Sequence, residues 1–148
     1  MSRLVYLCML LPLIIPTAVF SLCALTEGLS LAEMFIAVFK QITTKRLNLL
    51  ICGALGLVPI LLLLVVLWAY RRAGGADHNR YWMALGGLFP VIFVLTWTNF
   101  QFWPLFLPNM TYPGFPHGLE LIIGPVIFAP ISMLPGIGIG WWIGRKRG

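Results

Sequence analysis

Charged and apolar residues are separated along this chain into long blocks. Four stretches carry no formal charge, and acidic or basic residues mark their ends: residues 4–26, 47–70, 81–119 and 121–144. A bilayer core of roughly 30 Å needs about 20 apolar residues if one α-helix is to cross it. Each stretch is long enough to cross, so the pattern predicts an all-α membrane protein with four transmembrane helices.

These helices account for most of the 148 residues, and we expect one integral membrane domain, 1–148. The four predicted spans lie at about 4–25, 47–70, 81–103 and 119–143. Each contains at least one proline, which is tolerated at membrane depth where neighbouring helices or water satisfy the freed carbonyl groups. The apolar run that follows Arg3 is longer than the apolar core of a signal peptide, so we expect it to be retained as the first span.

The connection between the first two spans has the period of an interfacial amphipathic helix, at about 30–44. Ser30 and Glu33 fit a capping box, in which the two residues satisfy each other's backbone N–H groups. One side of the helical wheel is apolar, and four residues of that side are candidates for docking: Leu31, Phe35, Val38 and Ile42. Such a helix lies flat on the extracytoplasmic membrane surface, where it either anchors the chain in lipid or docks another subunit.

Basic residues are shared unequally between the two sides of the membrane. With both termini on one side, that side holds seven of the 10 basic residues, and the other holds Lys40, Lys45 and Arg46. The side richer in Lys and Arg faces the cytoplasm, so we expect both termini in the cytoplasm, in a bacterial inner membrane. Anionic lipid headgroups then explain the net charge of +6, and no nucleic-acid partner is expected.

Glycine recurs every fourth residue in the last span, at Gly136, Gly140 and Gly144. Glycines at this spacing let two helix backbones approach closely in lipid. The series predicts either packing within the chain's own bundle or a face that contacts another membrane protein.

One polar cluster lies inside a span, in the third predicted helix. It contains Thr96, Thr98, Asn99 and Gln101. Hydrogen bonding between helices is the ordinary role of such groups. The alternative is a polar pocket at Thr96, Asn99 and Gln101 that holds a quinone or a lipid headgroup.

Few residues offer catalytic or metal chemistry. His117 and Glu120 share a spacing that lets both face the same way, but no third ligand is near them, so we expect no metal site. Glu120 instead fits the first helical turn, where a carboxylate complements the positive helix end. Cys8, Cys23 and Cys52 lack CxxC spacing and indicate buried thiols, with a Cys23–Cys52 disulfide as the alternative. No P-loop or nucleophile–base set is present, so we expect neither an enzyme nor a cofactor.

Together these features favour a non-catalytic accessory or assembly subunit of a larger membrane complex, whose partners are the lipid bilayer and other membrane protein subunits. The spans lack an ionisable group in their interior, and ion-coupled transport usually needs one at membrane depth. Two alternatives stay open: a small homo-oligomeric transporter or channel, and a membrane immunity-type protein that binds a toxin.

Overall fold

The computed structural model describes residues 2–44, 46–107 and 119–147. Within these ranges the chain forms helices and short turns and no strand, which confirms the predicted all-helical class. The helices are α1 (Ser2–Thr26), α2 (Leu31–Thr43), α3 (Arg46–Arg72), α4 (Asp77–Phe102), the 3₁₀ turn η1 (Trp103–Phe106), α5 (Leu119–Ile123), the π turn η2 (Gly124–Phe128) and α6 (Ala129–Arg147). The last three form one continuous C-terminal helix.

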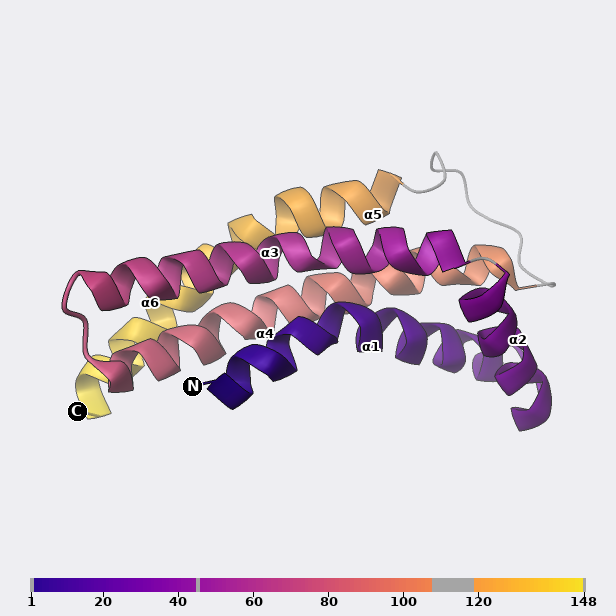
Figure 1. The fold of residues 1–148 in the computed structure, drawn as a ribbon, viewed down its shortest axis with the longest axis horizontal. Coiled ribbons are helices and arrows are strands. Elements are labelled where there is room, and N and C mark those ends of the chain that lie inside the picture. Colours follow the sequence, from indigo (N-terminus) through magenta and orange to yellow (C-terminus); the bar gives the residue numbers. More distant parts are fainter. Residues whose placement is uncertain (1, 45, 108–118, 148) are drawn as a thin grey trace.

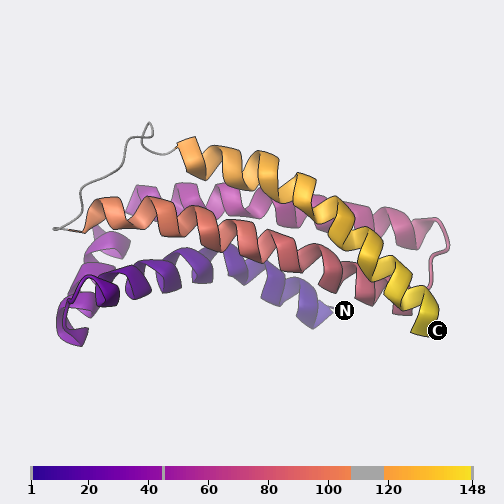
Figure 2. The ribbon, with the colours of Figure 1, turned by 180° about the vertical axis from the view of Figure 1, so that it is seen from behind.

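The long helices run along the molecule, and α2 lies across one end of it (Figure 1). The start of α1, the α3–α4 turn and the end of α6 lie toward the other end, as the view from behind also shows (Figure 2). We call these two ends the α2 end and the terminal end. This arrangement puts both ends of the described chain toward the same end of the bundle.

Among the described residues, three helices are long and apolar enough to cross a membrane: Leu49–Arg72, Asp77–Phe102 and Leu119–Arg147. In α1, the segment Leu10–Thr26 is a shorter apolar helix. The structure is therefore that of a helical membrane protein with three candidate spans, and it supports the predicted first span only to this extent.

The core of the bundle is built around α4. This helix packs against α1, α3 and α6, whereas α1 and α6 do not touch within the described residues. Side chains with almost no exposed surface come from all of these helices and include Val19, Ile60, Leu63, Val91, Leu95 and Ala129. At the α2 end the core closes over the buried Trp103 ring, which meets Phe20 edge to face with 5.4 Å between ring centroids. Burial of side chains from every long helix holds the bundle around α4.

The closest approach in the molecule is between α4 and α6. A Cβ atom added to Gly86 would overlap the carbonyl oxygen of Gly136, and one added to Gly136 would overlap the carbonyl oxygen of Gly86. Gly140 and Gly144 likewise lie against α4, where an added Cβ would meet backbone or side-chain atoms of Trp82 or Asn79. The glycine series predicted from the sequence therefore packs within this chain.

The terminal end carries basic side chains placed over tryptophan rings. Four such cation–π pairs are Arg72 over Trp68 at 4.3 Å, Lys146 over Trp142 at 3.8 Å, Arg147 over Trp82 at 4.7 Å and Arg145 over Trp141 at 5.4 Å. Tryptophan and basic residues both favour the headgroup region of a membrane. This end of the bundle therefore has the composition of a membrane–water interface.

Helix α2 is capped as its sequence predicts, and it also packs against the bundle. The Ser30 backbone N–H and hydroxyl donate hydrogen bonds of 2.9 and 2.8 Å to the Glu33 carboxylate, and the Ser30 oxygen accepts from the Glu33 N–H. Met34 and Gln41 are buried against the bundle, and Val38 packs against the same core. The residues at positions 34, 38 and 41 follow helical spacing, so one edge of α2 is fixed to the bundle.

Substitution of Gly136 tests the α4–α6 contact. We expect Gly136→Ala to lower the free energy of unfolding by roughly 1–3 kcal/mol, because the added methyl meets backbone atoms that cannot rotate away. The measurement is equilibrium unfolding in mixed micelles, followed by circular dichroism. Gly138→Ala is the matched control, since a Cβ there meets nothing within 4 Å. Equal losses in both variants would contradict the packing described here.

The capping box has a consequence for titration. Hydrogen bonds from the Ser30 backbone N–H first, and from its hydroxyl second, lower the pKa of Glu33 below its ordinary value of 4.5. A lowered carboxyl pKa means that the stabilisation is present above pH 4.5 and is lost as the pH falls through the lowered value. We expect Ser30→Ala to move the pKa of Glu33 upward, measured by carbon NMR of labelled glutamate. Ser132→Ala in α6 should leave this pKa unchanged, and a Ser30→Ala variant that titrates like the wild type would count against the box.

Candidate functional site

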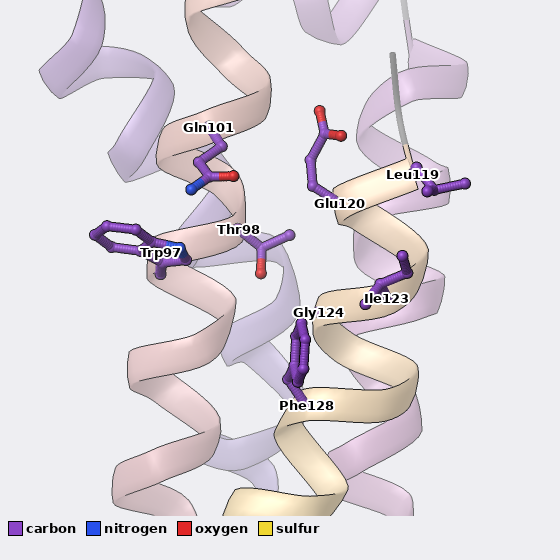
Figure 3. A pocket seen from close by; sticks show the side chains of 8 residues that line it. All are labelled: Trp97, Thr98, Gln101, Leu119, Glu120, Ile123, Gly124 and Phe128. Carbon is purple, nitrogen blue, oxygen red and sulfur yellow. The ribbon is translucent and has the colours of Figure 1, made fainter. Parts of the chain in front are cut away.

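A cavity at the α2 end separates α4 from the C-terminal helix (Figure 3). Its volume is about 280 Å³. Three lining residues come from α4 and five from α5 and η2: Trp97, Thr98, Gln101, Leu119, Glu120, Ile123, Gly124 and Phe128. The cavity combines a carboxylate, a hydroxyl and an amide with apolar walls, which is the usual make-up of a small-molecule site.

The α4 wall of the cavity supplies the hydroxyl and the amide. Thr98 is buried, and its hydroxyl donates a 2.6 Å hydrogen bond to the carbonyl oxygen of Val94 one turn earlier. Gly124 lies directly opposite, because a Cβ added there would overlap the Thr98 hydroxyl. Gln101, one turn beyond Thr98, points across the space toward the C-terminal helix (Figure 3). The Thr98 hydroxyl has already used its hydrogen, so toward the cavity it acts as an acceptor.

The carboxylate of Glu120 stands at the end of the cavity nearest Gln101 (Figure 3). Glu120 lies in the first turn of α5, as the sequence predicts. Both of its carboxylate oxygens are nevertheless buried, and neither accepts a hydrogen bond. None of the eight lining residues is basic. A buried carboxylate without a partner is costly, and the favourable helix end supplies no hydrogen bond to offset that cost.

The backbone beside the cavity is a π turn. Pro125 and Pro130 lack the N–H groups that an α-helix would use here. The N–H of Ala129 bonds to the carbonyl of Gly124, five residues back, instead of to that of Pro125. Single π turns of this kind occur often at functional sites. Here the turn carries two lining residues, Gly124 and Phe128.

The cavity opens on the outside of the bundle. Trp97 and Phe128 line it and are 60% and 58% exposed. Phe128 points between the two helices below Gly124, whereas the Trp97 ring extends away from them at the rim (Figure 3). A bundle that crosses a membrane presents such exposed apolar side chains to lipid. The mouth of the cavity therefore lies on the surface that lipid would cover.

The polar cluster predicted in the third span divides between two places. Gln101 lines the cavity together with Thr98, but Thr96 and Asn99 do not. Asn99 is buried on another side of α4, where it donates to the Leu95 carbonyl and accepts from the indole N–H of Trp103, each at 2.8 Å. The pocket suggested for Thr96, Asn99 and Gln101 therefore coincides with this cavity only at Gln101, because residues two apart on a helix, such as Asn99 and Gln101, point in different directions.

The α2 residues predicted for docking also divide. Leu31, Phe35 and Ile42 are exposed, whereas Val38 packs against the core of the bundle. A helical wheel shows which side of α2 is apolar, but part of that side, at Met34 and Val38, is occupied by the contact with the bundle. The uncovered residues are Leu31, Phe35, Ile36, Phe39 and Ile42.

Cysteine and metal chemistry is limited in the described part of the chain. Cys23 and Cys52 are both buried with free thiols, so the alternative of a disulfide between them is not realised. No group of three or more His, Cys, Asp and Glu side chains could hold a metal ion among the described residues. His117, considered together with Glu120 in the sequence, lies outside them.

Comparison with protein-family models, with curated proteins and with solved structures finds no match to this chain. The site is therefore interpreted from its own geometry.

Replacement of Glu120 tests whether its buried carboxylate lowers the free energy of unfolding. We expect Glu120→Met to raise the free energy of unfolding by about 1–3 kcal/mol, because an unsatisfied buried acceptor is replaced by an apolar side chain of similar size. The measurement is equilibrium unfolding in mixed micelles. Glu27→Met, in the turn after α1, is the control and should leave stability nearly unchanged. A clear loss of stability in Glu120→Met would show that the carboxylate is structural.

Proposed function

We propose that this protein is a non-catalytic accessory or assembly subunit of a larger membrane complex. The observation that carries the proposal is the uncovered apolar face of α2. Five side chains on this face are between 47% and 68% exposed: Leu31, Phe35, Ile36, Phe39 and Ile42. The described part of the chain leaves this face open, and a neighbouring protein is the partner that we assign to it.

The α2 face is suited to docking because the helix is held in place. Its first turn is locked by the Ser30–Glu33 capping box, and Met34 and Gln41 are buried against the bundle. Phe35 and Phe39 stand one turn apart on the adjoining open side, where both are about two-thirds exposed. Rigid aromatic side chains are the residues that most often carry the binding energy of protein interfaces.

The proposed topology has four spans, with α1 as the fourth. α1 extends over Ser2–Thr26 and runs beside α3 and α4, against which it packs. The cation–π pairs at the terminal end support placing that end in the headgroup layer. With seven of the 10 basic residues on this side, both termini face the cytoplasm of a bacterial cell, in its inner membrane.

Copurification tests the subunit role. The wild-type protein, extracted in a mild detergent, should bring down other membrane proteins in fixed stoichiometry. We expect Phe35→Ala/Phe39→Ala to lower the recovered partner by about tenfold or more, since interface aromatics commonly contribute most of the affinity. The measurement is quantitative mass spectrometry of the purified sample.

The control for this experiment is Phe89→Ala/Phe93→Ala in α4. These two phenylalanines are 77% and 64% exposed, close to the values for the α2 pair, and their loss should leave partner recovery unchanged. A monodisperse wild-type monomer would overturn the proposal. So would an α2 variant that keeps its partners, because α2 would then serve only to anchor the chain in lipid.

A further inference from the structure

The described walls of the Glu120 cavity provide no positive charge. The two carboxylate oxygens are buried without a hydrogen-bond donor, and the described lining residues include no Lys, Arg or His. The other polar groups beside them add acceptors. The Thr98 hydroxyl donates its only hydrogen to the Val94 carbonyl, so toward the cavity it can only accept, and the Gln101 amide supplies an acceptor oxygen as well as an N–H₂ group. A ligand that donates hydrogen bonds or carries positive charge complements this set.

The remaining walls indicate what else the ligand contains. Gly124 and Phe128 lie at the apolar end of the cavity, away from Glu120 and Gln101 (Figure 3), and Ile123 also lines it. Hard inorganic cations are held by several oxygen ligands at once. The apolar side chains at this end of the cavity supply no such ligands, so a small inorganic cation would leave this part of the cavity empty. An aromatic ring beside a carboxylate favours an organic cation, through attraction between the charge and the ring face.

We propose that the Glu120 cavity binds an amphipathic organic cation, with its ammonium group at Glu120 and its apolar part against Ile123 and Phe128. The ligand enters from lipid, because the mouth of the cavity lies between the exposed side chains of Trp97 and Phe128. The cavity lies between α4 and the C-terminal helix, away from the open face of α2, so this binding does not depend on the proposed subunit role. An ammonium group of this kind is found both in free lipophilic amines and in amine-bearing lipid headgroups.

The test is a titration of the purified full-length protein, in a maltoside detergent, with hexylammonium. Binding is measured by isothermal titration calorimetry, with the neutral hexanol and the anionic hexyl sulfate as comparison ligands. We expect saturable binding of the cation and at least about tenfold weaker binding of both comparison ligands, since the charge-assisted contact is lost. Equal affinity for the cation and for hexanol would overturn the proposal.

Three variants localise the binding. Glu120→Gln keeps the size of the side chain and should weaken cation binding by at least about tenfold, while hexanol binding stays the same. Phe128→Leu removes the aromatic ring from an exposed position and should weaken it by about threefold. Glu27→Gln makes the same charge change outside the cavity and should have no effect. Unchanged affinity in Glu120→Gln, with the fold intact by circular dichroism, would overturn the proposal.

A competition experiment separates the two sources of the ammonium group. Phosphatidylethanolamine is added to the micelles before titration, and a glycolipid without an amine is the control. A weaker apparent affinity for hexylammonium with phosphatidylethanolamine alone supports a lipid headgroup as the occupant. An affinity that neither lipid changes supports a free amine. Equal weakening by both lipids would mean that lipid tails fill the cavity, and this would contradict a site for ammonium.

Discussion

The direct backbone contact between α4 and α6 determines how the rest of the bundle is arranged. At Gly86 and Gly136, the backbone carbonyl of each helix occupies the position that a Cβ atom on the other glycine would take. Lipid tails are as apolar as leucine, so close van der Waals packing replaces the hydrophobic effect as the force between helices in a membrane. α4 then offers its other sides to α1 and α3, and the core forms around Val91 and Leu95. The cavity at Glu120 begins where this close contact ends, past Gly124.

The all-helical class and the positions of the long helices follow from the sequence, because hydrophobic length and charged ends are local properties. The predicted spans at 47–70 and 81–103 correspond to α3 and α4, whose ends differ by a few residues. The capping box at Ser30 and Glu33 was equally predictable, since both partners lie within one turn. In all these cases the decisive interactions lie within a few residues of one another.

The site depends on pairings between helices, and these were not predictable from one sequence. Glu120 was assigned to a helix end, and nothing in its neighbourhood shows that its oxygens are buried opposite Gln101. Val38 and Phe35 are equally apolar members of one helix side, yet one packs inward and the other is exposed. One signal was available: Thr98 and Gln101 are three residues apart and share a face of α4, whereas Asn99 does not.

The π turn at Gly124–Phe128 explains how its first residue, Gly124, and a glycine beyond it, Gly136, face the same neighbour. Gly124 and Gly136 are 12 positions apart, and at about 100° per residue an unbroken α-helix would place them about 120° out of phase. The extra residue taken up by the π turn reduces the effective separation to about 11 positions, which leaves them only about 20° apart. Both glycines therefore meet α4. The contact surface along the C-terminal helix thus has a phase correction built into it, and Gly124 belongs to this surface although Phe128 and Ser132 interrupt the four-residue glycine spacing before Gly136.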